Sequence, residues 1–261
     1  MNVTDFGFGA LDEQLWTLLI LSIRCGAALM AAPMFGMMSV PVTIRALFGF
    51  VLALFIMSWM PVPDLPPMLS LEAMLIVLQE ALIGVALGFV LQIAFAIPLI
   101  AAEQISGTMG LAIATSVDPN TGAQSGAIGQ YFSLLMTLIF LSIGAHLIWL
   151  ELILESYRAL PPGLAIFTPE RAMQVVNFAG LGFLTAAAIA LPVVLVLLLV
   201  QIVTGVLSRS APSLNLFALG LPAGVLAGLA ALIASSAILF EQFVDLSELS
   251  LEQVGALVVA P

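Results

Sequence analysis

The chain has 261 residues, of which 62% are hydrophobic and only 8% are charged. This polar fraction is too small to cover a water-soluble globule of that length, so the composition excludes an ordinary soluble domain and indicates a membrane-type protein. The net charge is −10, and the five basic residues, all arginine, form no cluster, which argues against binding to nucleic acid or to anionic lipid through a basic patch.

The sequence offers no motif for a metal or a cofactor. Cys25 is the one cysteine, so an internal disulfide is excluded, and no Cys/His set has metal-ligand spacing. No P-loop, zinc motif or dinucleotide fingerprint occurs either, and we therefore expect no cofactor. The N-terminus carries acidic residues and meets no basic residue before Arg24, unlike a cleaved signal peptide, so we expect the first apolar segment to be retained.

Apolar runs and helix-breaking residues predict about six apolar segments arranged as helical hairpins. In chain order they cover residues 11–32, 42–60, 70–105, 131–157, 172–208 and 213–240. Thr168 followed by Pro169 is typical of an N-cap and a first helical position. The expected fold class is all-α, built from membrane-type hairpins.

Two of these segments are too long for one straight crossing of a bilayer. Pro98 lies within segment 70–105 and Pro192 lies midway in segment 172–208, so we expect proline-broken helices. The residues from 245 to 261 follow the last apolar segment and are expected to form a solvated acidic tail.

Two further features of the predicted helices imply contacts between them. Arg24 lies too deep in the first segment to face lipid, and Glu80 in the third segment is the candidate partner for its charge. Glycines recur every four residues in the third and last segments, and such small faces allow helices to approach closely. The glycines expected at helix contacts are Gly84, Gly88, Gly220, Gly224 and Gly228.

The stretch from Glu103 to Gln130 is the one irregular, Gly-rich segment in this apolar chain. Its glycines and Pro119 prevent one continuous helix. Backbone that is not helical is tolerated at membrane depth only where protein encloses it or where it lines a wet cavity. We therefore expect this stretch to lie in or over a pathway.

The residues alone leave three kinds of function open. An intramembrane serine protease would use Ser125 with His146, but the chain has a single histidine and no evident oxyanion hole. A small-solute or ion transporter would use broken helices with Glu80, Glu103 and Asp118 as ion or proton groups, although no internal duplication is visible. A pore for unfolded polypeptide would use the Gly-rich stretch as a flexible closure of small side chains.

A series of short motifs resembles one family in order and spacing over most of the chain. The motifs are PMFG at 33–36 followed by Pro41 and Arg45, GVALGF at 84–89, GTMG at 107–110, Asp118-Pro119 with Gly122, IGQYF at 128–132 and APSLNLFALGLP at 211–222. In this order they resemble the FliR/SctT family of the type III secretion export gate, and its flagellar branch most closely. A single export-gate domain over residues 1–261 is the expectation.

The resemblance implies a non-enzymatic subunit, present once, in a helical pore complex of the bacterial inner membrane at the flagellar base. The family's partners are five copies of FliP and about four of FliQ, together with FlhB, and unfolded flagellar proteins pass through the pore. Residues 106–122 resemble the family's plug, which closes the channel, and Glu103 and Gln124 are expected as polar positions near the lumen. The plug residues singled out are Ser106, Gly107, Thr108, Met109, Gly110, Leu111, Ala112, Ile113, Ala114, Thr115, Ser116, Val117, Asp118, Pro119 and Gly122.

Overall fold

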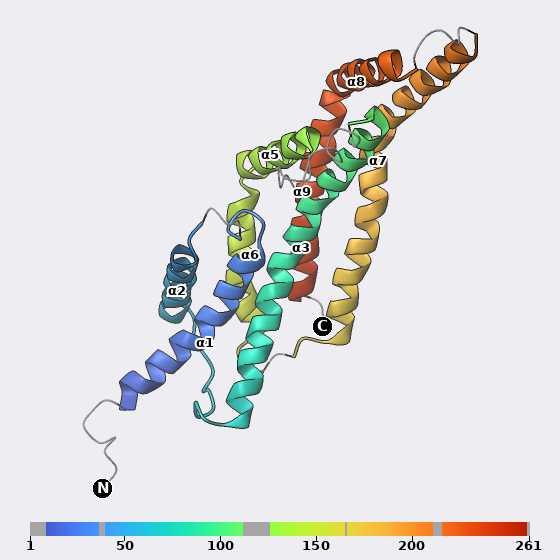
Figure 1. Ribbon diagram of the computed structural model, residues 1–261. Helices are drawn as coiled ribbons and strands as arrows, with labels where there is room; N and C mark the ends of the chain where they lie inside the picture. Colours follow the sequence, from blue (N-terminus) through green and yellow to red (C-terminus); the bar gives the residue numbers. More distant parts are fainter. Residues whose placement is uncertain (1–8, 37–39, 112–125, 165, 211–215, 260–261) are drawn as a thin grey trace. The chain divides into compact units, whose positions relative to one another are not determined.

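The computed structural model describes residues 9–36, 40–111, 126–164, 166–210 and 216–259, and every helix or strand within these ranges is an α-helix. The predicted all-α class is therefore confirmed. The helices are α1 (Gly9–Ala31), α2 (Val42–Trp59), α3 (Leu71–Met109), α5 (Ala127–Ser142), α6 (Ala145–Ala159), α7 (Pro169–Ser210), α8 (Leu216–Ala234) and α9 (Ser236–Val259) (Figure 1). By length and composition, four described helices could cross a membrane, or up to six spans exist if α5–α6 and α8–α9 each count as one.

The chain divides into two compact units. The first unit comprises Met1–Ile93, Ala145–Phe178 and Leu249–Pro261, and the second comprises Ala94–Gly144 and Ala179–Glu248. Helices α3, α7 and α9 each contribute residues to both units.

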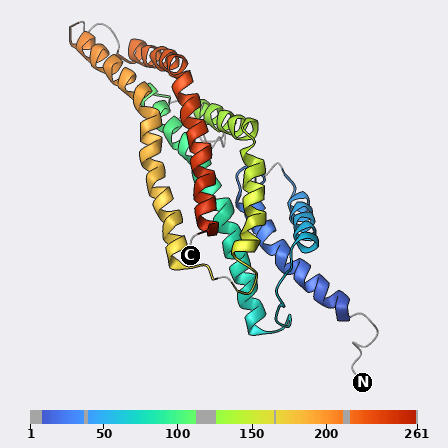
Figure 2. The same ribbon diagram turned by 180° about the vertical axis from the view of Figure 1, so that it is seen from behind.

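In the first unit, α1 and α2 lie side by side, as the opposite views in Figures 1 and 2 both show. Leu21 of α1, Leu87 of α3 and Trp149 of α6 are fully or almost fully buried. The Trp149 indole N–H donates a 3.2 Å hydrogen bond to the Leu87 carbonyl, which leaves no unsatisfied donor on this large buried side chain.

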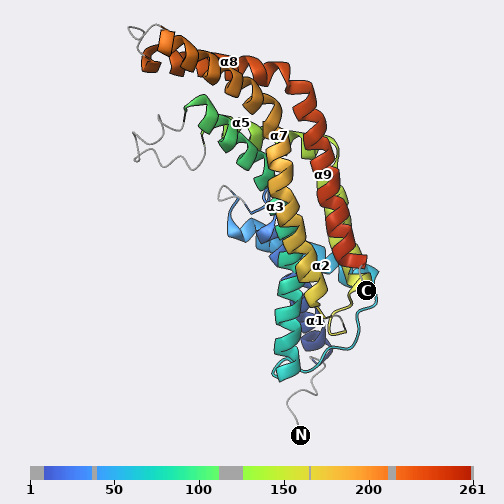
Figure 3. The same ribbon diagram turned by 90° about the vertical axis from the view of Figure 1, so that its right-hand side faces the viewer.

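In the second unit, aromatic side chains pack edge to face between helices. Phe132 of α5 contacts Phe243 of α9 with ring centroids 5.4 Å apart, and Phe95 of α3 contacts Phe140 of α5 at 5.3 Å. Both distances lie within the favourable range for T-shaped pairs. Helix α8 leads into α9 through a bend at Ser235 (Figure 3).

The long helices continue through their prolines, contrary to the breaks predicted at Pro98 and Pro192. A proline inside a helix costs about 3 kcal/mol because it removes one hydrogen bond and crowds the preceding turn. Pro98 is buried, and packing along the 39 residues of α3 outweighs this local cost. Helix α3 therefore extends past the predicted end at residue 105 to Met109.

The predicted segment 131–157 is instead two helices. Helix α5 ends at Ser142, and Gly144 adopts a φ of +73° before α6 begins. A left-handed residue just after a helix ends it, and glycine takes this conformation without a Cβ clash, so Gly144 is the local cause of the break.

Of the residues predicted as an acidic tail, those from 245 to 259 form the second part of α9. Glu248 and Glu252 are exposed, as expected, whereas Leu251 and Val254 between and beyond them are buried. The segment is therefore an amphipathic helix, whose apolar positions recur at helical spacing among the carboxylates.

Candidate functional site

The candidate site is the C-terminal end of α3, where the proposed plug begins. Of the plug residues, the structure describes Ser106 to Leu111, and the others, from Ala112 to Gly122, lie outside the described residues together with Gln124. Ser106 to Met109 are helical. Glu103, three residues before this stretch, is exposed on the same helix. The described part of the predicted gate is thus a helix end and its cap.

Two backbone hydrogen bonds terminate α3 at this point. The Leu111 N–H donates to the Ser106 carbonyl at 3.1 Å, and the Gly110 N–H donates to the Gly107 carbonyl at 3.2 Å. Gly110 has a φ of +83°. This paired pattern around a left-handed glycine is the Schellman motif, which satisfies helix-terminal carbonyls that would otherwise lack partners. Gly110, and not Gly107, is therefore the glycine that stops the helix.

A side chain from α7 satisfies the next carbonyl. Gln201 Nε2 donates a 2.8 Å hydrogen bond to the Thr108 carbonyl oxygen. The Thr108 hydroxyl bonds back to the Gln104 and Ile105 carbonyls at 3.0 and 2.9 Å, so it is satisfied within its own helix. Gln201 is the one residue here whose side chain fastens the end of α3 to a neighbouring helix by a hydrogen bond within the described part of the chain.

Helix α8 packs a face of glycines against the end of α3. A Cβ at Gly228 would lie 2.6–2.7 Å from the side chain of Met109, and a Cβ at Gly224 would lie 3.2 Å from the Met109 carbonyl oxygen. Met109 is buried. Gly220 and Gly224 line a pocket of about 270 Å³ beside Thr108 and Gln201. This face of α8 therefore approaches α3 closely within the chain.

The glycines of α3 pack in a similar way in the first unit. A Cβ at Gly84 would meet the Arg24 carbonyl oxygen and lie 2.9 Å from Ala27 Cβ. A Cβ at Gly88 would meet the Ala28 carbonyl oxygen. Here too the small residues serve contacts between this chain's own helices, α1 and α3.

Arg24 and Glu80 form the pair predicted from the sequence. Arg24 Nε lies 2.8 Å from Glu80 Oε2, and Nη2 lies 2.6 Å from Oε1, a bidentate arrangement. The remaining donors bind the Ser156 carbonyl and hydroxyl and the Leu160 carbonyl, at 2.8–3.1 Å. The guanidinium also stacks 4.1 Å from the Tyr157 ring centroid. Both carboxylate oxygens of Glu80 are therefore engaged by Arg24, which weighs against a transported ion binding there.

Only some of the residues of the other two functions belong to the described part of the chain. His146 lies in the first turn of α6, and its buried Nδ1 has no hydrogen-bond partner among the described residues. Ser125 and Asp118 lie outside the described residues. Among the residues that the structure describes, no three His, Cys, Asp or Glu side chains are grouped so as to hold a metal ion.

Sequence reasoning missed the Gln201 contact and the carbonyls that Arg24 binds. Gln201 is a polar amide near the end of a long uncharged run, and that placement was the available signal. Its hydrogen-bond acceptor is a backbone carbonyl on another helix. Every residue has a backbone carbonyl, so the sequence does not indicate which one is bound.

Comparison with known proteins places the chain in a family. Residues 15–249 match the family described as bacterial export proteins, family 1. The chain is 33% identical over 239 residues to flagellar biosynthetic protein FliR of Bacillus subtilis (90% of this chain, 91% of the relative) and 31% identical over 224 residues to that of Escherichia coli (86% and 84%). It is 32% identical over 170 residues to surface presentation of antigens protein SpaR of Salmonella typhimurium (65% and 63%). The matched region contains the capped end of α3, the glycines of α8 that contact it, and Arg24 with its hydrogen-bond partners. The chain belongs to the FliR family, family 1 of the bacterial export proteins.

Proposed function

We propose that this chain is an export-gate subunit of the flagellar type III secretion apparatus, in which residues 106–122 close a pore for unfolded flagellar proteins. Family membership and the names of the flagellar relatives support the export role. The observation that carries the gate is the built anchor at the end of α3, which holds the first residues of the stretch 106–122.

A plug needs a fixed root, because cargo would otherwise pull it out of the channel. The Schellman cap at Gly110 ends the rigid helix just before residue 112. Gln201 holds the last turn to α7, and Met109 is inserted against Gly224 and Gly228 of α8. Two independent contacts therefore fix the position from which the plug segment leaves α3.

The proposed setting is a pore of five FliP and about four FliQ subunits in the bacterial inner membrane, in contact with FlhB. Helix α7 leaves many large apolar side chains exposed, among them Leu195, Leu199, Val203 and Val206. Exposed apolar surface of this extent requires lipid or other protein chains as its environment. Subunits of such a pore and the surrounding membrane lipid would together cover it.

The test is a deletion of residues 112–122 that joins Leu111 to Ala123 through a short Gly-Ser linker and leaves the capped helix intact. The complex should still assemble, while the closed channel should conduct ions in planar bilayers. Gly180→Ala is the control, because Gly180 lies on α7 outside residues 106–122 and its Cβ would meet no atom within 4 Å. A deletion complex whose resting conductance equals that of the parent would refute the plug.

A further inference from the structure

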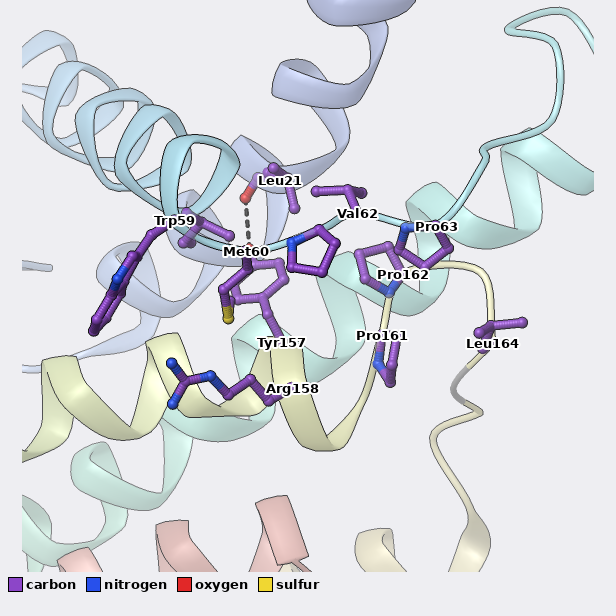
Figure 4. A pocket seen from close by; sticks show the side chains of 12 residues that line it. Leu21, Trp59, Met60, Val62, Pro63, Tyr157, Arg158, Pro161, Pro162 and Leu164 are labelled. Atoms are coloured by element: carbon purple, nitrogen blue, oxygen red, sulfur yellow. Dashed lines mark hydrogen bonds between the residues drawn. The ribbon is translucent and has the colours of Figure 1, made fainter.

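The first unit contains a second pocket, of about 570 Å³, and none of the proposed plug residues lines it (Figure 4). This volume lies within the range of about 300–1,000 Å³ that is typical of small-ligand sites. The pocket is formed where the Pro-rich connectors after α2 and α6 meet the body of the unit, and its lining is predominantly apolar. Its walls include Ile56, Met60, Val62, Pro161, Pro162 and Leu164.

The lining is suited to a hydrocarbon chain because it presents few unpaired polar groups. Four lining residues are prolines, Pro61, Pro63, Pro161 and Pro162, and proline has no backbone N–H. The one hydroxyl in the wall, that of Tyr157, already donates a 2.6 Å hydrogen bond to the Leu21 carbonyl (Figure 4). An alkyl chain in this pocket would therefore leave few donors without partners.

Trp59 and Arg158 line the same pocket, and both are exposed. The Arg158 guanidinium carbon lies 5.3 Å from the Trp59 ring centroid, and the Trp59 side chain is 63% exposed. Arg158 Nη1 is also 2.8 Å from Glu155 Oε2, in a pair whose side chains are 52% and 48% exposed. Arg158 is thus a positive group in the lining of the pocket, and its carboxylate partner Glu155 lies next to it, outside the lining.

The pocket lies at the ends of apolar helices. Helix α2 has 18 residues and is about 27 Å long, close to the hydrocarbon thickness of a bilayer, and it ends at Trp59. Helix α6 ends at Ala159, one residue after Arg158. Tryptophan and arginine at the ends of membrane helices are characteristic of the layer where lipid headgroups meet the acyl chains.

We propose that this pocket binds one zwitterionic phospholipid whose headgroup carries a phosphate and a primary ammonium. An acyl chain occupies the apolar cavity, the phosphate accepts hydrogen bonds from Arg158, and the ammonium donates to Glu155. The pairing of Arg158 with the adjacent Glu155 favours a neutral headgroup. An anionic headgroup would leave Glu155 facing a negative charge, in a chain whose net charge is already −10.

The test uses the full chain reconstituted in phosphatidylcholine vesicles that contain a trace of phosphatidylethanolamine or phosphatidylglycerol with a diazirine on one acyl chain. The bulk lipid has a quaternary ammonium, which cannot donate to Glu155. After illumination, mass spectrometry should locate the phosphatidylethanolamine label mainly on residues 56–63 and 157–164. Phosphatidylglycerol should label these residues far less.

Three variants separate the pocket from general lipid contact. Arg158→Gln removes the charged donor and should lower labelling by about tenfold, and Val62→Trp should block it by filling the cavity. Arg209→Gln is the matched control, because Arg209 is an exposed arginine at the end of α7, and its labelling should equal that of the parent. Arg158 is exposed, so its replacement should leave folding intact, which the unfolding temperature checks.

Several results would overturn the proposal. These are labelling that is equal for the two lipids, labelling that Arg158→Gln leaves unchanged, or labelling spread evenly along the exposed faces of α2 and α7. Capture of a protein chain by a photo-crosslinking amino acid at position 62 in intact cells would also overturn it, because it would make the occupant a polypeptide. Loss of the lipid site would leave the plug proposal untouched, since the latter rests on conductance.

Discussion

Arg24 in the first unit and Gln201 in the second both donate hydrogen bonds to carbonyls near the C-terminal end of a helix. Arg24 binds the Ser156 and Leu160 carbonyls around the end of α6, and Gln201 binds the Thr108 carbonyl at the end of α3. Arg24 is charged, fully buried and paired with Glu80. Gln201 is neutral and exposed.

These two caps differ in how costly they are to disturb. A buried charge that loses its partner is left uncompensated, whereas an exposed amide that loses a carbonyl can bind water instead. The end of α6 is therefore locked in place, and the end of α3 is held by a bond that can be exchanged. The root of the proposed plug is thus held by one hydrogen bond that water can replace and by the contact of Met109 with α8.

The largest effect is expected from Glu80→Ala. This change leaves the Arg24 charge buried without its carboxylate and should lower the free energy of unfolding by about 3–5 kcal/mol. Chemical unfolding in detergent measures the loss. In the double variant Arg24→Leu with Glu80→Leu, both charges are gone, and most of the stability should return.

Glu155→Ala is the control for that comparison, because Glu155 pairs with Arg158 at a half-exposed site. The expected loss there is at most about 1 kcal/mol. Equal losses of unfolding free energy for Glu80→Ala and Glu155→Ala would show that the buried Arg24–Glu80 pair stabilises the fold no more than the half-exposed Arg158–Glu155 pair does.

A medium effect is expected from Gly84→Ala. Its Cβ would meet the backbone carbonyl of Arg24, which cannot rotate away, so α1 and α3 must separate at a cost of about 1–3 kcal/mol. Gly26→Ala is the control on α1, because a Cβ there would meet no atom within 4 Å. It should be neutral or slightly stabilising, since alanine favours helix over glycine.

Gly228→Ala extends this test to the second unit. Its Cβ would contact only the flexible Met109 side chain among its nearest neighbours, so a shift of that chain can relieve the clash. The loss of unfolding free energy should therefore be smaller than for Gly84→Ala. A larger loss at Gly228 would mean that the seat of α3 on α8 is as rigid as the contact between α1 and α3.

The sequence predicted those features that follow from the chemistry of one residue. A buried arginine needs an acid, which indicated Glu80, and glycines at spacing four predicted close helix approach. Thr168 and Pro169 predicted the start of α7, where the Arg171 N–H lies 3.5 Å from the Thr168 hydroxyl oxygen. Each of these predictions depends either on residues that are close together in the sequence or on finding one residue of opposite charge.

Features that depend on three-dimensional neighbours could not be predicted in this way. The continuity of α3 through Pro98 depends on packing that outweighs a local cost, which no local pattern displays. Both glycines of GTMG could have ended α3, and their order alone does not distinguish the helical Gly107 from the left-handed Gly110. The partners of the glycine faces were also open, because spacing identifies a face but not the helix that covers it.

The smallest effect is expected from Gln201→Leu, which removes the exposed cap of α3. The hydrogen bond is worth about 1 kcal/mol, so global stability should change little. Local opening of the last turn should become about fivefold more frequent, which corresponds to that energy. Hydrogen exchange at the Gly110 and Leu111 amides, the two donors of the Schellman cap, measures this opening.

Gln92→Leu is the matched control, since Gln92 is an exposed glutamine on α3 itself, outside the capped end. It should leave the exchange of both cap amides unchanged. If the Gln201 bond restrains the plug, Gln201→Leu should also raise the resting conductance, although less than the deletion of residues 112–122. Faster exchange without any change in conductance would separate the two roles: Gln201 would then cap a helix without restraining the gate, and the seat of Met109 on Gly224 and Gly228 would be the contact that fixes the plug.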